Sequence, residues 1–167
     1  MTYIDARPLR AIAAGVAMML LYGSRLTHGA VRQTPQGEAF PLKPMFAWSR
    51  AIGLPAYVIF YAYTMMAERH SLPWYFSLLL LAAIFFGIAP MPGTITLTGD
   101  AIVKRYWLMP DRTIPYNGVA RIELKRRGRR IRIVGENGTV ITHTVNHSGA
   151  QEFRRQLEQR TGKQVAA

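Results

Sequence analysis

The chain has 167 residues, no cysteine and a net charge of +12, with 21 lysines and arginines against 9 acidic residues. That length suits one ordinary domain, or a smaller domain with a membrane anchor. The lack of cysteine excludes a disulfide framework, a thiolate metal site and a cysteine nucleophile. The positive balance favours an anionic partner, either phosphate or anionic lipid.

Residues 1–44 are predicted to form an N-terminal segment with a short apolar helix at 11–23 and a linker at 31–44. The apolar run at 11–23 is short for a membrane span. It is read as a third transmembrane helix, as a helix lying in the membrane interface, or as a signal peptide. A membrane helix is favoured, because no clear cleavage site follows the run. Prolines and the lack of a periodic pattern predict the linker.

Two apolar runs follow, at 51–67 and 72–90, and neither contains a charged residue. A helix needs about 20 apolar residues to cross a bilayer, and only four residues separate the two runs. We therefore predict a transmembrane helical hairpin over residues 45–90. A buried soluble hairpin is the alternative, and it is disfavoured because the second run has no polar face.

The distribution of positive charge predicts the orientation of this hairpin. Residues 91–167 carry 14 lysines and arginines against 6 acidic residues, whereas the loop between the two runs carries one arginine. Cytoplasmic segments of membrane proteins are enriched in these cations. We therefore predict a multi-pass protein of the cytoplasmic (inner) membrane, with the C-terminal domain in the cytoplasm.

Residues 91–162 are predicted to form a small, mainly-β domain with a C-terminal helix, followed by a tail at 163–167. About six short alternating segments with turn signals between them lie between Gly93 and Val145, and Asn137-Gly138 supplies a hairpin turn. They predict a curled antiparallel sheet or barrel. Ser148 and Gln151 have the spacing of a helix N-terminal capping box, and Gly162 is a typical helix end.

Three stretches resemble the bacterial pleckstrin-homology-like membrane proteins: ITLTGDAIVKRYW, TIPYNGVARIEL and FRRQLEQR. In that family a short transmembrane hairpin is followed by a small β-domain with a C-terminal helix, and Ile114-Pro115-Tyr116 with Ile122 matches its turn and strand. The resemblance covers about residues 46–162. It implies a binding or scaffolding module without catalytic residues. Residues 1–44 have no counterpart in the family's minimal layout. About six strands are predicted here, whereas the family has seven. The seventh is expected within RTIPYNG or MPD.

The sequence offers little for catalysis. Nucleotide-binding and nucleophile-elbow motifs are absent. His143 and His147 are four residues apart but fall at a strand end and in a loop, so we expect exposed polar positions and no metal site. Asp100 and Asp111 fall in turns, where aspartate is common. We therefore predict that the protein is not an enzyme and has no cofactor.

The most distinctive segment is LKRRGRRIRI at 124–133. It reads as a strand, a turn around Gly128 and a second strand, which crowds cations around one hairpin. The predicted contact residues for lipid or a partner are Lys125, Arg126, Arg127, Arg129, Arg130 and Arg132, supported by Lys104, Arg105 and Arg121.

Several roles for this basic hairpin remain open. The first alternative is that its charges serve only membrane topology and solubility. The second is binding of anionic lipid headgroups, and the third is binding of an acidic protein. Nucleic acid is disfavoured, because no aromatic residue within 124–133 offers base stacking. The favoured function is a noncatalytic, membrane-anchored module that contacts anionic lipid or a protein partner, or assembles with copies of itself. The alternative is an accessory subunit of a membrane enzyme or transport complex that packs through its helices.

Overall fold

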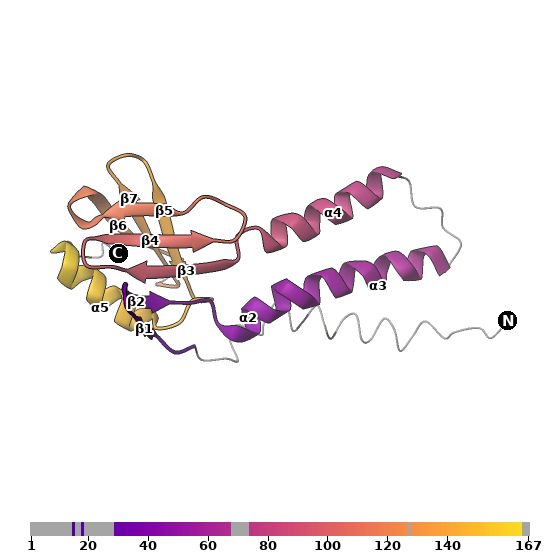
Figure 1. The fold of residues 1–167 in the computed structure, drawn as a ribbon, viewed down its shortest axis with the longest axis horizontal. Helices are drawn as coiled ribbons and strands as arrows, with labels where there is room; N and C mark the ends of the chain where they lie inside the picture. Colours follow the sequence, from indigo (N-terminus) through magenta and orange to yellow (C-terminus); the bar gives the residue numbers. More distant parts are fainter. Residues whose placement is uncertain (1–14, 16–17, 19–28, 68–73, 127, 165–167) are drawn as a thin grey trace. The chain divides into compact units, whose positions relative to one another are not determined.

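The computed structural model describes residues 15, 18, 29–67, 74–126 and 128–164 (Figure 1). The chain divides into two compact units. The first, here called the helical unit, comprises Met1–Leu26 and Met45–Ile88. The second, here called the β-domain, comprises Thr27–Pro44 and Ala89–Ala167.

The larger sheet of the β-domain has five antiparallel strands that pair in chain order. They are β1 (Arg32–Thr34), β2 (Gly37–Phe40), β3 (Pro92–Leu97), β4 (Ala101–Tyr106) and β5 (Arg112–Pro115). Strand β2 pairs directly with β3, with Phe40 opposite Ile95, although about fifty residues separate the two strands along the chain. The helical unit is therefore inserted between two neighbouring strands.

The smaller sheet has three antiparallel strands in the order β6-β7-β8. It follows the short 3-10 helix η2 (Tyr116–Gly118) and consists of β6 (Val119–Lys125), β7 (Arg130–Gly135) and β8 (Val140–Thr144). The predicted turn at Asn137-Gly138 is confirmed, because Gly138 has a φ of 78° and links β7 to β8. Burial alternates along β7, so Ile131 and Ile133 face inward and Arg132 between them faces outward.

Helix α5 (Ala150–Thr161) ends the domain and buries Phe153 and Leu157 completely. Its C-terminal end at Gly162 is confirmed: this glycine has a φ of 65° and donates its N–H to the carbonyl of Glu158 at 2.9 Å. The predicted cap at the other end is wrong. The hydroxyl of Ser148 donates to the carbonyl of Pro41 at 2.8 Å, and Gly149 occupies the capping position.

The hydrophobic core of the β-domain draws on both sheets and on α5. Its buried members are Phe40, Ile95, Leu97, Ile102, Ile114, Val119, Ile122, Ile131, Ile133, Ile141, Phe153 and Leu157. Strands β2 to β8 each contribute at least one side chain to this core, with strict alternation along β7 and β8, and α5 contributes its apolar stripe. The predicted mainly-β domain with a C-terminal helix is therefore confirmed.

The predicted linker at 31–44 is wrong, because this segment contains β1 and β2. Gly37 shows why the hairpin forms at this position. Its φ of 132° is open to glycine, and a Cβ there would lie 2.1 Å from the carbonyl oxygen of Leu97. The close approach of β2 to β3 therefore depends on a residue without a side chain.

The helical unit contains α2 (Pro44–Trp48), the π-helical turn η1 (Ser49–Gly53), α3 (Leu54–Ala67) and α4 (Trp74–Ile88). Helix α3 has 14 residues and α4 has 15. At 1.5 Å per residue, both are shorter than a hydrocarbon core of about 30 Å. Within the described part of the chain, no helix combines the length and apolar character needed to cross a membrane.

The predicted membrane hairpin is therefore wrong. The predicted location as a multi-pass protein of the cytoplasmic membrane depended on that hairpin, so it is corrected with it. Within the described residues, η1 takes the start of the first apolar run, so α3 begins only at Leu54, and a turn takes the end of the second run, so α4 ends at Ile88. The prediction for 11–23 lies outside the described residues, apart from Gly15 and Met18.

Candidate functional site

The basic segment forms the β6–β7 hairpin, as its strand–turn–strand pattern predicts. Lys125 and Arg130 are the last paired residues, and the turn between them is tight. Arg126 has a φ of 54° and Gly128 a φ of 83°, both in the left-handed region. An L-residue in that region costs roughly 1–2 kcal/mol. The turn therefore holds an arginine in a strained backbone conformation, and Arg127 lies outside the described residues.

Three of the predicted contact residues share one internal counterion. The carboxylate of Glu123 lies 2.7 Å from Arg121 Nε, 3.3 Å from Lys125 Nζ and 3.6 Å from Arg132 Nη1. Partial burial by itself would raise the pKa of Glu123, but the hydrogen bond from Lys125 and the neighbouring cations lower it below its ordinary value. Cross-strand register creates this cluster, since Glu123 is opposite Arg132.

The turn itself keeps its charge. Arg126, Arg129 and Arg130 have no ion-pair partner among the residues that the structure describes. Arg126 and Arg129 are exposed, and Arg130 is half-buried at the start of β7. Among the predicted contact residues of the hairpin that the structure describes, these three are therefore the ones without an ion pair.

The predicted supporting residues on β4 lie on the other sheet and have structural contacts. Lys104 Nζ donates to the carbonyl of Thr142 on β8 at 3.0 Å, and Arg112 Nη1 donates to the carbonyl of Val140 at 3.1 Å. Burial, with the charge of Arg112, lowers the pKa of Lys104 to about 8. Arg105 lies 3.8 Å from Asp111 and donates to Gln36 at 2.7 Å. Lys104 thus joins the two sheets.

A pocket of about 170 Å³ lies beside the basic turn. Leu124 and Ile131 of the hairpin form part of its apolar wall, together with Val145 and Ala150. Two cationic side chains also line it: Arg129 from the turn and Arg154 from α5. The pocket therefore combines an apolar wall with two guanidinium groups. It was not predicted from the sequence, because its parts come from three separate segments.

The buried ring of His143 belongs to the same pocket wall, and His147 lies next to it. Both side chains are buried, so the prediction of exposed histidines is wrong. The His143 ring stacks on Phe153 with centroids 4.4 Å apart, and its Nε2 lies 3.2 Å from the carbonyl oxygen of Ser148. Burial lowers the pKa of His143 to about 4 and that of His147 to about 3. Both rings are therefore neutral near pH 7.

His147 uses both ring nitrogens within the protein. Its Nδ1 accepts the backbone N–H of Thr144 at 3.1 Å, so its Nε2 carries the proton and donates to the carbonyl of Gly93 at 2.9 Å. This arrangement fixes the tautomer and leaves no lone pair for a metal. Among the described residues, no three histidine, aspartate or glutamate side chains are grouped so that they could hold a metal ion.

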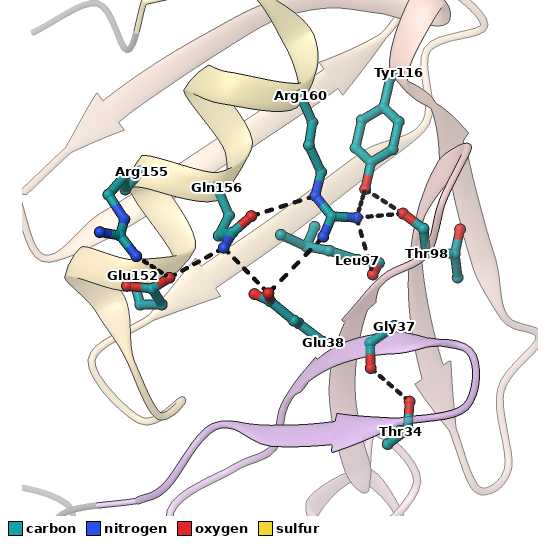
Figure 2. Close-up of polar contacts among 10 residues, drawn as sticks. All are labelled: Thr34, Gly37, Glu38, Leu97, Thr98, Tyr116, Glu152, Arg155, Gln156 and Arg160. Atoms are coloured by element: carbon teal, nitrogen blue, oxygen red, sulfur yellow. Dashed lines mark hydrogen bonds and ion pairs between the residues drawn. The ribbon is translucent and has the colours of Figure 1, made fainter.

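A polar network holds α5, and with it Arg154, in place (Figure 2). Arg160 Nη1 donates to the carbonyl of Thr98 at 2.5 Å and to the hydroxyl of Tyr116 at 3.3 Å. Gln156 Nε2 donates to the carboxylate of Glu38 on β2 at 3.1 Å, and Arg160 lies 4.0 Å from the same carboxylate. The helix is thus tied to β2, β3 and η2. This network was not predicted from the sequence, because it depends on β2, which was not predicted either.

Comparison with known proteins gives no relative for this chain: no family model, no curated protein and no solved structure matches it.

Proposed function

We propose that the chain is a noncatalytic binding module whose β6–β7 turn contacts an anionic partner. The observation that carries this proposal is the unneutralised charge of Arg126, Arg129 and Arg130 beside a pocket. The other described cations of the same hairpin share the single carboxylate of Glu123. The described cations of the hairpin that have no ion pair among the described residues therefore lie at the turn.

The resemblance to pleckstrin-homology-like proteins supports a binding role. The family has seven strands and a C-terminal helix; the described β-domain has eight strands, of which β2–β8 make up seven and β1 is an additional edge strand, and α5 follows them. The expectation of a further strand within RTIPYNG or MPD is wrong, because the additional strands come from the segment before the helical unit. The membrane anchor of the family is not part of the proposal, because no helix in the described part of the chain is long and apolar enough to supply it.

Electrostatics gives the turn its affinity. A cation close to an anionic surface contributes roughly 1 kcal/mol, and guanidinium groups bind carboxylate or phosphate oxygens in pairs. The proposal that the module is noncatalytic is supported by the bonding of its titratable side chains. His143 and His147 are neutral and bonded within the fold, and the hairpin's acid, Glu123, is bonded to three cations.

The test compares two triple variants of the full chain that lose the same charge. One is Arg126→Gln, Arg129→Gln and Arg130→Gln; the other is Arg121→Gln, Lys125→Gln and Arg132→Gln, which removes the cations around Glu123. The probes are phosphatidylcholine vesicles with and without phosphatidylserine, and poly-glutamate. We expect the turn variant to lose binding to at least one anionic probe and the matched variant to keep most of it.

Equal losses in the two variants would mean that net charge alone governs binding, and the assignment to the turn would then be wrong. Unchanged binding in both would also contradict it. Circular dichroism of each variant checks that the β-domain remains folded.

The helical unit favours a second candidate, an accessory subunit that packs on another protein through α3 and α4. Leu81 and Phe86 of α4 are 63% and 72% exposed, which is unusual for large apolar side chains. Replacing both with glutamine should then remove a co-purifying protein that the turn variant retains. The opposite result, loss with the turn variant alone, would assign the partner to the β-domain.

A further inference from the structure

We propose that the pocket beside the β6–β7 turn receives one apolar side chain of an acidic protein segment, whose carboxylates lie against Arg129 and Arg154. This inference rests on the proposed function and names the partner of the same site. Two features carry it: the pocket has an apolar wall, and two guanidinium groups line it.

The size of the pocket indicates a single side chain. Sites for drug-sized ligands and cofactors are commonly about 300–1,000 Å³, whereas this pocket holds about 170 Å³. Protein partners often contribute one or two anchor side chains that fill such hollows and dominate affinity. An aliphatic or aromatic side chain would cover Leu124, Ile131 and Val145 and exclude water from them.

The charges indicate what flanks that side chain. Among the described residues, Arg129 has no ion-pair partner, and Arg154 is paired through its Nε alone, with Glu158 at 3.1 Å. Both guanidinium groups can donate two parallel hydrogen bonds to a carboxylate, the geometry that arginine prefers. His143 adds no charge to the wall, because its ring is neutral near pH 7. The wall is thus suited to an apolar group and the guanidinium groups to acidic ones.

An anionic bilayer fits this site less well than a peptide does. Lipid headgroups would neutralise the turn arginines, but a flat surface of phosphates offers no group of the right size for the apolar wall. A free phosphate would likewise leave the wall exposed to water. A polypeptide places an apolar side chain and carboxylates within one or two residues of each other.

The experiment uses short capped peptides and the full chain, with binding followed by fluorescence anisotropy. One peptide has leucine between pairs of glutamates, a second has alanine in place of leucine, and a third has leucine between lysines. We expect the first to bind about tenfold or more tightly than the second, because only leucine fills the wall. The lysine-flanked peptide should show no binding.

Two pairs of matched variants assign that difference to the pocket. Ala150→Phe fills the pocket and should abolish the preference for leucine, whereas Ala120→Phe, at an exposed position that does not line it, should preserve the preference. Arg129→Gln should weaken both glutamate peptides about tenfold, since it removes a paired contact. Arg155→Gln removes the same charge from an exposed position outside the pocket and should have little effect.

The possible results separate this inference from the function on which it rests. Equal binding of the leucine and alanine peptides, with loss in the turn variant, overturns the inference and leaves the proposed function standing. Binding of phosphatidylserine vesicles without binding of either glutamate peptide does the same and identifies a lipid partner. Binding of no glutamate peptide, no vesicle and no poly-glutamate overturns both.

Discussion

The β-domain and the helical unit treat apolar side chains in opposite ways. Phe40, Ile95 and Phe153 of the β-domain are completely buried. In α3 and α4, the described side chains include only Val58 and Gly87 as buried residues, while Trp74 and Phe86 are more than two-thirds exposed. Helices α3 and α4 are richer in apolar residues than the β-domain, yet fewer of their described residues are buried. Apolar composition therefore says little about burial when it is separated from the geometry of the elements.

The cause lies in how each unit closes. A strand has one inner face, and two sheets with a covering helix enclose that face on all sides. A helix that is apolar all round can turn only part of its surface toward one neighbouring helix. The β-domain is therefore a finished folding unit, whereas α3 and α4 keep apolar surface available for contact. Exposed patches of this kind usually mark an interaction site.

The most direct test of this difference in burial is to remove one phenylalanine side chain from each unit. Phe153→Ala should lower the free energy of unfolding by about 3–5 kcal/mol, because it leaves a cavity between Phe40 and His143. Phe86→Ala should change it by less than about 0.5 kcal/mol, because that ring is exposed. Urea denaturation of the full chain, followed by circular dichroism, measures both. Comparable losses in the two variants would mean that Phe86 is buried in solution.

A glycine substitution tests the same contrast at the level of the backbone. Gly37→Ala should destabilise the protein by about 3 kcal/mol, because its Cβ would meet the carbonyl oxygen of Leu97 and its φ is positive. Gly87→Ala in α4 should be close to neutral. Its Cβ would meet only the end of the Leu54 side chain, which can move, and alanine favours the helix.

The same denaturation curves measure the glycine pair. A mild effect of Gly37→Ala would mean that β2 can move away from β3. A large effect of Gly87→Ala would mean that Leu54 is held tightly against α4.

The parts of the fold that the sequence predicted correctly are those governed by local pattern. Strands β3 to β8 are short apolar-containing segments bounded by turn residues, burial alternates along β7 and β8, and α5 has an apolar face, so each is visible in a short window. Strand β2 was missed because Glu38-Ala39-Phe40 is brief and pairs with a strand about fifty residues away. The buried histidines were missed for a different reason. The alternation that buries Ile141 also buries His143, and this signal was available in the sequence.

The site shows the same division between local and distant information. The positions of the cations on the hairpin followed from the sequence, because they depend on period and turn alone. Their ion pairs did not follow from the sequence, since Glu123 on β6 pairs with Arg132 on the neighbouring strand β7. The pocket depends on the placement of α5, which Glu38 and Arg160 hold to β2, and these two residues lie far apart in the sequence. Apolar length also overestimated the helices, because it does not locate η1.

The last prediction concerns pH, and it tests the β-domain alone because both described histidines belong to it. The pKa of each lies far below the ordinary value of 6.5, at about 4 for His143 and about 3 for His147. Below pH 6.5 the unfolded chain binds protons that the folded chain does not, so stability falls as the pH falls toward 4. Each histidine should contribute roughly 1.4 kcal/mol per pH unit.

The window between pH 6.5 and 5 isolates this effect, because ordinary carboxylates titrate below it and Lys104, with a pKa of about 8, is already mostly protonated. Urea denaturation at a series of pH values gives the slope, and His143→Gln should reduce it to about half, since one titrating ring remains. A slope near zero in the unmodified chain would mean that water reaches both rings. Because Phe153 and Phe40 enclose His143, water entry would require the same packing to open that Phe153→Ala removes.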